Sequence, residues 1–338
     1  MSGIRPGSSG PYYEDLEPGW TFESDGYSLS AGHVAWFQAL AGDQNPTHVD
    51  FARARSAGWR EAPVNTALVA HVAIGQSTRA TREVIANLFY RSALFSRPVE
   101  VGSTLRTRVE VVGRTGATPR ADRPARGKVM LGMTTVDDDE NEVFAVQRCA
   151  LVRCAAADSP PPMSEFDELA SADMAVGRFD PWRPLLPPSS QGRDWSPGEE
   201  RFDHLLEPVD DALGLVRLTG NEARAHRDSS QGQLSRRLVY GGHTLSLAQA
   251  ALSRLVDDVH VVAGWHGCTH PAPVFEGDHL HTSATLLDRS LVKGVDVASF
   301  EVRTTARRDD GTVAEVQRWT PVVIMAPAAG QNTTPRPV

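Results

Sequence analysis

The sequence has few cysteines, few aromatic residues and no long apolar run. Its three cysteines, Cys149, Cys154 and Cys268, are odd in number and show no Cys-x-x-Cys spacing. This pattern excludes a disulfide framework, and we expect three small buried side chains. No stretch approaches the length of apolar sequence that spans a bilayer, and the N-terminal residues have no apolar core typical of a secretory signal. We therefore expect a cytoplasmic protein without a membrane partner.

Charge of one sign is not concentrated in any part of the chain. Lys and Arg number 34 against 42 Asp and Glu, the net charge is −8, and the basic residues are scattered. A nucleic-acid partner is therefore not expected. His266, His270, His279 and His281 fall on strand-like runs without tight ligand spacing, so no metal site is expected. A content of 41% hydrophobic and 22% charged residues is typical of a globular protein, and 338 residues favour two domains.

The two halves of the chain resemble each other. Residues 42–50 align without gaps on residues 220–228, at an offset of 178 (220 − 42). Residues 97–105 ("RPVEVGSTL") match residues 272–280 ("APVFEGDHL") at an offset of 175 (272 − 97). Two matches in the same order indicate an internal duplication.

Each half shows the same order of expected elements. A short helix (31–42 or 208–220) precedes the aligned loop, and a longer apolar helix (64–80 or 241–256) follows it. Four β-rich runs broken by Gly, Pro or Asp-rich turns come next. A long helix packed against an antiparallel sheet is an α+β arrangement.

A proline-rich stretch separates the halves. The segment contains eight of the 23 prolines and no sustained period, which is typical of an extended linker. The expected organisation is a disordered tail at 1–11, an N-terminal domain at 12–156, a linker at 157–198, a C-terminal domain at 199–326 and a second tail at 327–338.

The loop of the first half carries an acid and an imidazole. Asp43 and His48 lie five positions apart around Pro46, which restricts the backbone. A carboxylate and an imidazole that face one water can take a proton from it and return a proton to a neighbouring carbon. The alternative is that the pair only stabilises a turn, as Asp and Asn often do.

This loop resembles the signature of the MaoC-like, (R)-specific enoyl-CoA hydratases, Gly-Asp-x-Asn-Pro-x-His-x-Asp. The matching residues are Gly42, Asp43, Asn45, Pro46, His48 and Asp50. The whole chain is similar to two-hotdog members typified by mesaconyl-CoA hydratase, through "VIANLFYR", "EARAH" and "RRLVYGGH".

The resemblance implies a double hotdog fold and a reaction. Two tandem hotdog units would pack as a pseudo-dimer, each with a long helix wrapped by an antiparallel sheet. The implied reaction is addition of water to a 2-enoyl-CoA, or its removal from an (R)-3-hydroxyacyl-CoA, with an acyl-CoA as substrate and no metal or redox cofactor. Hotdog units often assemble further, so formation of a homo-oligomer stays open.

Two pairs are candidates for catalysis. Asp43 with His48 is the first candidate, and Asn221 with His226 at the aligned positions of the second half is the next. Asparagine can hold a water but cannot take its proton, so His226 would have to act alone as acid and base.

The start of the long helix would bind the thioester oxygen. In the family this helix opens with His-Gly, and the glycine N–H stabilises the developing oxyanion. The second half has Tyr240, Gly241 and Gly242 at this place, whereas the first half has Thr66 and Ala67. Neither half therefore matches the family pattern completely.

Further side chains are expected to contact the substrate. Asn45 belongs to the first loop, and Arg224 stands in the second loop where the first has Pro46. A guanidinium would suit a second carboxylate, which favours a branched C5 dicarboxylic acyl group such as mesaconyl. His71 and His243 lie among apolar residues on the long helices and are expected to be core or supporting groups.

Two other functions are compatible with these residues. A thioesterase on the same fold would also place a carboxylate near the helix start, and a non-catalytic subunit that binds acyl thioesters would explain why both sites are imperfect. The basic runs at 79–84 and 106–111 are interpreted as solvated charge, with binding of the CoA phosphates as the alternative.

Overall fold

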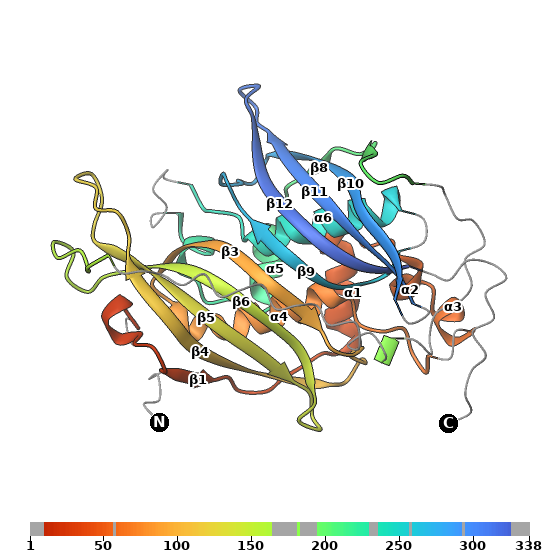
Figure 1. The fold of residues 1–338 in the computed structure, drawn as a ribbon, viewed down its shortest axis with the longest axis horizontal. Coiled ribbons are helices and arrows are strands. Elements are labelled where there is room, and N and C mark those ends of the chain that lie inside the picture. Colours follow the sequence, from red (N-terminus) through yellow and green to blue (C-terminus); the bar gives the residue numbers. More distant parts are fainter. Residues whose placement is uncertain are drawn as a thin grey trace.

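The fold is described from a computed structural model. The described residues are 10–56, 59–163, 181–182, 195–229, 236–256, 259–292 and 295–325. Most of the predicted linker (164–180 and 183–194), residues 1–9 of the predicted N-terminal tail, residue 326 and the whole predicted C-terminal tail (327–338) lie outside these ranges. Two similar α+β units lie side by side, each with a long helix against a curved antiparallel sheet (Figure 1).

In the described residues, the first unit contains two short N-terminal strands, four α-helices, two 3-10 helices and four long strands. Its elements are η1 (Tyr13–Asp15), β1 (Thr21–Glu23), β2 (Tyr27–Ser28), α1 (Ala31–Ala41), α2 (Pro46–Val49), α3 (Phe51–Ser56), α4 (Thr66–Ser77), η2 (Thr78–Thr81), β3 (Val84–Phe95), β4 (Thr104–Gly116), β5 (Arg126–Val136) and β6 (Glu142–Arg153). Helix α1 begins after Ser30, whose side chain accepts the N–H of His33, and ends at Gly42 with a left-handed φ of 62°.

The second unit repeats this order. Its elements are β7 (Glu200–Phe202), β8 (Glu207–Pro208), α5 (Ala212–Leu218), η4 (Arg224–His226), α6 (Gly241–Leu255), β9 (Val259–Thr269), β10 (His279–Val292), β11 (Val295–Arg307) and β12 (Val313–Met325). Every residue of α4 and residues 242–252 of α6 are buried, because α4 packs against β4, β5, β6 and β9, α6 packs against β10 and β11, and the two helices pack against each other. The predicted duplication therefore exists in the fold.

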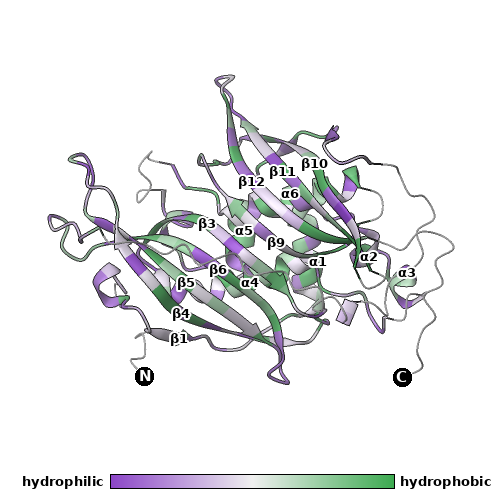
Figure 2. Ribbon diagram, in the orientation of Figure 1, coloured by the Kyte–Doolittle hydropathy of each residue, from purple (hydrophilic) through white to green (hydrophobic). Residues whose placement is uncertain are grey.

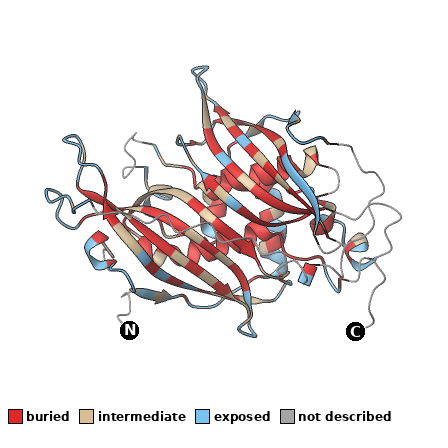
Figure 3. Cartoon of the chain, in the orientation of Figure 1, coloured by how far each residue is buried: buried red, intermediate tan, exposed pale blue. Residues whose placement is uncertain are grey.

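The two units share one sheet. The strand order is β1-β4-β5-β6-β3-β9-β12-β11-β10-β7, and antiparallel pairing of β3 with β9 joins the units. Tyr90 lies opposite Cys268 and Arg91 opposite Gly267 in this pairing. Hydrophilic and hydrophobic residues succeed one another along the strands, and exposed residues gather at the hairpin ends (Figures 2 and 3). This junction brings side chains of each unit to the loops of the other.

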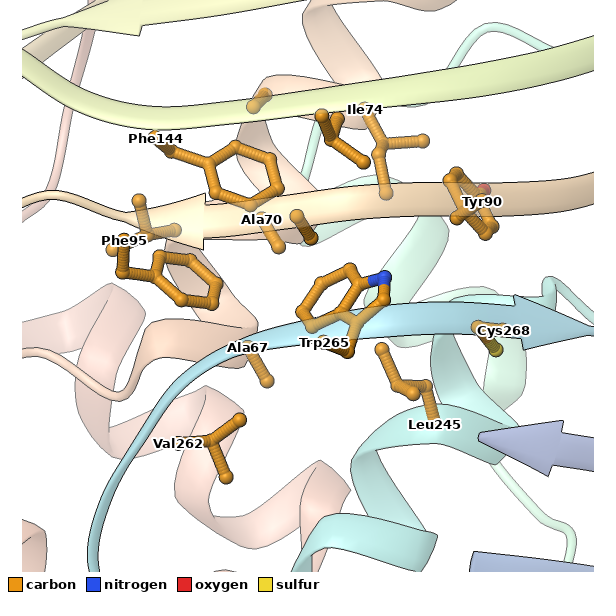
Figure 4. Close-up of a cluster of buried hydrophobic side chains, with 14 of the residues drawn as sticks. Ala67, Ala70, Ile74, Tyr90, Phe95, Phe144, Leu245, Val262, Trp265 and Cys268 are labelled. Carbon is orange, nitrogen blue, oxygen red and sulfur yellow. The ribbon is translucent and has the colours of Figure 1, made fainter. Parts of the chain in front are cut away.

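The main core lies between the sheet and helices α4 and α6 (Figure 4). Phe95 stacks on Phe144 with ring centroids 4.6 Å apart, and Trp265 of the second unit packs against both rings. Gly75 permits α4 to approach the second unit, because a Cβ there would lie 1.9 Å from the Thr219 carbonyl oxygen.

The three cysteines are buried and free, as predicted. In the described part of the chain, no helix has the length and apolar character needed to cross a membrane.

Candidate active site

The structure brings Asp43 and His48 into direct contact. Asn45 caps the short helix α2 and Pro46 is its first residue, so the loop turns sharply between the acid and the imidazole. His48 Nδ1 lies 2.7 Å from Asp43 Oδ2. Both residues are buried, with exposed fractions of 3% for His48 and 8% for Asp43. The pair is therefore shielded by the fold.

Other donors also bind the Asp43 carboxylate. Asn65 Nδ2 donates to Oδ2 at 2.6 Å, and the N–H of Asn45 donates to Oδ1 at 3.1 Å. Burial alone raises the pKa of Asp43, but the charge and hydrogen bond of His48 and the bonds from Asn65 and Asn45 outweigh it, so the pKa lies below its ordinary value. Both carboxylate oxygens are thus engaged by the protein.

Asn65 links this pair to both long helices. Its Oδ1 accepts the N–H of Ala67 at 2.8 Å, which caps the start of α4, and also accepts Gln249 Nε2 at 2.9 Å from α6. The N–H of Ala67, near the helix start where the family has its oxyanion-binding glycine, is therefore already bonded to a side chain.

A histidine of the second unit packs on the first loop. His260 of β9 accepts Asn45 Nδ2 at its carbonyl (3.4 Å), and its Nδ1 lies 3.4 Å from Thr47 Oγ1. Burial, with the charges of His48 and Arg53, lowers the pKa of His260 to about 3, so the ring is neutral. Sequence reasoning missed this residue. The repeat offset of 175 aligns His260 with Ile85 of the first unit, and nothing in that difference indicates a contact with the first loop.

The aligned loop of the second unit opens into a cavity of about 220 Å³, here called the inner cavity. The second unit contributes η4, its preceding loop and the start of α6, and the first unit contributes α4, β3 and β6. The lining includes four predicted site residues, which are Asn221, His226, Tyr240 and Gly241. Figure 4 labels Ile74 and Tyr90, two residues of the first unit that line this cavity, among the buried side chains of the core.

One ring nitrogen of His226 bonds to the backbone, and the other takes no part in that bond. Its Nδ1 lies 3.0 Å from the Leu238 carbonyl oxygen, which can only accept, so the N–H is on Nδ1 and Nε2 carries the lone pair. Burial lowers the pKa of His226 to about 4, and the charges of Arg148 and Arg227 act in the same direction against the Leu238 bond. His226 is therefore a neutral base near pH 7.

Asn221 reproduces the turn that Asp43 makes in the first unit. Its Oδ1 accepts the N–H of Ala223 at 2.9 Å, as Asp43 Oδ1 accepts the N–H of Asn45. Arg227 Nε donates to the Asn221 carbonyl at 2.7 Å and fixes the loop. The structure thus places Asn221 and His226 at one cavity, as it places Asp43 and His48 in one buried cluster.

The start of α6 has no side-chain cap. Tyr240 is the N-cap residue and makes no capping hydrogen bond, so the first N–H groups of α6, at Gly241 and Gly242, have no intrahelical acceptor. A Cβ on Gly241 would lie 2.8 Å from His270 Nε2, and one on Gly242 would lie 2.7 Å from His71 Nδ1. Both glycines are needed for close packing at the start of α6, and Gly241 lines the inner cavity.

A hydrogen-bonded chain orients Tyr240. Ser246 Oγ donates to the Gly242 carbonyl at 2.8 Å and lies 2.9 Å from His71 Nε2. His71 Nε2–H is therefore the donor to Ser246, and His71 Nδ1 accepts the Tyr240 hydroxyl at 3.3 Å. Burial, with His243 nearby, lowers the pKa of His71 to about 3. His71 is thus a buried residue that orients Tyr240. Neither ring nitrogen of His243 has a hydrogen-bond partner in the described chain.

A second hollow of about 480 Å³, here called the outer cavity, adjoins the inner one. The two share the lining residues Val84, Ile85, Ala86, Ala225, Leu238 and Pro273. Its arginines are Arg82, Arg123, Arg126, Arg153, Arg224 and Arg236. The Arg224 side chain is 54% exposed and lies 3.7 Å from Glu83, so it lines the outer cavity. Arg82 belongs to the basic run at 79–84, whereas Arg106 and Arg108 of the other run lie elsewhere, in a hollow of the sheet.

Comparison with known proteins relates the chain to one family. A family model described as "MaoC like domain" matches residues 16–128. A solved structure from Mycobacterium tuberculosis, a conserved hypothetical protein described as having a double hotdog fold, is 33% identical. The similarity covers 93% of this chain and 98% of that one, with a TM-score of 0.83.

Two curated enzymes are similar over most of the chain. The beta-methylmalyl-CoA dehydratase of Chloroflexus aurantiacus is 26% identical over 318 residues, which cover 89% of each chain. The mesaconyl-CoA hydratase of Cereibacter sphaeroides is 25% identical over 315 residues, which cover 89% of this chain and 90% of that enzyme.

Proposed function

This chain belongs to the MaoC-like family of double-hotdog proteins, and on that premise we propose that it is a hydro-lyase. It adds water to the double bond of a 2-enoyl-CoA, or removes water from an (R)-3-hydroxyacyl-CoA. The observation that supports the proposal most is the inner cavity, where the neutral imidazole of His226 and the uncapped start of α6 line one space.

The start of α6 binds the thioester in this proposal. The N–H groups of Gly241 and Gly242, together with the helix dipole, stabilise the negative charge that develops on the thioester oxygen. Tyr240 is held by His71 and fixes the turn before these donors. A donor that is already oriented needs no rearrangement when the enolate forms.

His226 transfers the proton. Its Nε2 takes a proton from water as the water oxygen bonds to the β-carbon, and the imidazolium then gives a proton to the α-carbon of the enolate. Asn221 holds the water, because an amide donates and accepts hydrogen bonds but takes no proton. No electrons are transferred, and the CoA thioester is the substrate.

The first loop has a structural role in this proposal. Asp43 is bonded to His48, Asn65 and Asn45, and the N–H at the start of α4 is capped. The outer cavity binds the phosphates of CoA, since guanidinium groups recognise phosphate through paired hydrogen bonds.

The proposed acyl group is a branched C5 dicarboxylic one, such as mesaconyl. Two relatives that cover most of the chain carry names of enzymes for mesaconyl-CoA and beta-methylmalyl-CoA. This choice of substrate is a proposal that rests on those two similarities.

The test is to offer mesaconyl-CoA and crotonyl-CoA to the purified protein. We expect the enoyl-thioester absorbance to fall and the product mass to rise by one water. A thiol reagent and saturated acyl-CoAs provide the control. Release of free CoA would favour a thioesterase, and tight binding without turnover would favour a non-catalytic acyl-binding subunit; either result would contradict the proposal.

A further inference from the structure

The inner cavity contains a buried arginine that the reaction itself does not need. Arg148 lies on β6 of the first unit, is 2% exposed and lines the inner cavity. Its Nη1 donates to Ser77 Oγ at 2.8 Å and its Nη2 donates to Thr81 Oγ1 at 2.7 Å. Both partners are neutral hydroxyls near the end of α4, so the guanidinium is fixed but not neutralised.

Arg148 has no anionic partner in the described chain. Its Nε has no hydrogen-bond acceptor there, and its electrostatic neighbours are the phenols of Tyr90 and Tyr240 and the thiol of Cys149, none of which is a carboxylate. The end of α4 supplies only a partial negative charge. Burial accordingly lowers the pKa of Arg148, although the guanidinium stays charged.

A buried cation without a counter-ion is costly, and a bound anion would remove that cost. The inner cavity is the space from which such an anion can reach Arg148, because the same cavity is lined by His226. The charge of Arg148 also influences the pKa of His226, which places the two groups within electrostatic range.

We propose that Arg148 binds the second carboxylate of a dicarboxylic acyl-CoA and selects that substrate class. This inference rests on the proposed function and names the residue that recognises the distal carboxylate of the acyl group. The carboxylate supplies the missing counter-ion and accepts the unused guanidinium N–H groups, and the phenol of Tyr90 on the same wall is a further donor.

Arg224, the residue that the sequence suggests for this role, has a different position. It is largely exposed, lies near Glu83 and lines the outer cavity. We therefore expect Arg224 to affect all CoA esters alike. The two arginines provide a matched pair of variants.

The test compares two substrates that differ only in the distal group. Mesaconyl-CoA carries a carboxylate where tiglyl-CoA carries a methyl group. Loss of one partner of a buried charged pair costs about 2 kcal/mol or more, so Arg148→Gln should lower the mesaconyl-to-tiglyl ratio of kcat/KM by at least about 30-fold. Arg224→Gln should leave this ratio within about threefold. An equal loss for both esters in Arg148→Gln would overturn the inference and assign Arg148 a structural role.

Equilibrium binding separates this inference from the proposed function. Methylsuccinyl-CoA and 2-methylbutyryl-CoA are saturated, so their binding does not depend on hydratase activity. Wild-type protein should bind methylsuccinyl-CoA at least about 30-fold more tightly, and this comparison needs no variant. If no enoyl-CoA is hydrated but this preference holds, the proposed function fails and the carboxylate site stands. Equal binding of the two esters would overturn the carboxylate site.

Discussion

Replacement of Asp43 by asparagine should destabilise the protein and leave its chemistry intact. The change removes the charge that accepts hydrogen bonds from His48 Nδ1 at 2.7 Å and Asn65 Nδ2 at 2.6 Å. An asparagine also turns an amide donor toward one of these two donors. A hydrogen bond to a charged group contributes about 1.5–3 kcal/mol, so loss of the charge that accepts both bonds should cost about 3 kcal/mol or more of unfolding free energy.

Thermal unfolding measures this loss. A change of 1 kcal/mol shifts the Tm of a domain of this size by about 2–4 °C, so Asp43→Asn should lower the Tm by about 6 °C or more. Asp50→Asn is the matched control, because Asp50 is exposed and accepts one hydrogen bond, from the N–H of Arg53. Surface changes of this kind stay within about 0.5 kcal/mol.

Hydration kinetics on the same variant decide the role of the first loop. At 25 °C the folded Asp43→Asn protein should retain kcat for mesaconyl-CoA within about threefold, because general acid–base groups contribute about 100-fold or more when they act in the reaction. A fall of kcat by about 100-fold with an unchanged Tm would refute the structural role of Asp43.

Three further predictions concern the second unit and the buried histidines. His226→Ala should lower kcat by at least about 100-fold, and wild-type kcat/KM should stay level near neutral pH and fall as the pH drops through about 4, where His226 gains its proton. Gly242→Ala places a Cβ against the Tyr240 ring and 2.7 Å from His71 Nδ1 and should reduce kcat at least about 10-fold, whereas Gly132→Ala, with its nearest atom at 3.6 Å, should not. His71 and His260 have pKa values of about 3 in the fold against 6.5 ordinarily, so the unfolded chain binds more protons below pH 6.5. Above pH 6.5 these two histidines do not lower the free energy of unfolding. As the pH falls toward 3 the free energy of unfolding decreases, by about 2 kcal/mol for each histidine at pH 5. Urea unfolding at pH 7.5 and pH 5 would detect this decrease.

The sequence predicted the fold well because both units follow local rules. The long helices, expected at 64–80 and 241–256, are Thr66–Ser77 and Gly241–Leu255. The short helix expected at 208–220 is Ala212–Leu218, and Gly220 has the left-handed φ of 61° that ends such a segment. Apolar periodicity and helix-ending glycines are local signals, and they identified the duplicated order of elements.

The sequence could not show which loop faces an open cavity. That difference depends on side chains of the opposite unit, which the pairing of β3 with β9 brings into place. His260 of β9 packs on the first loop, whereas Arg148 of β6 lines the cavity beside the second. Contacts between residues more than 100 positions apart leave no periodic signal. The sequence therefore favoured the first loop, which has the better family signature, as the catalytic one.

The most direct test of the central claim compares two histidines at equivalent positions of the repeat. The rate of mesaconyl-CoA hydration is measured for His226→Ala and His48→Ala under the same conditions, on protein that circular dichroism shows to be folded. The account predicts that His226→Ala retains at most about 1% of the wild-type kcat and that His48→Ala retains most of it. The reverse order, with activity lost only in His48→Ala, would place the reaction in the first unit and contradict the account.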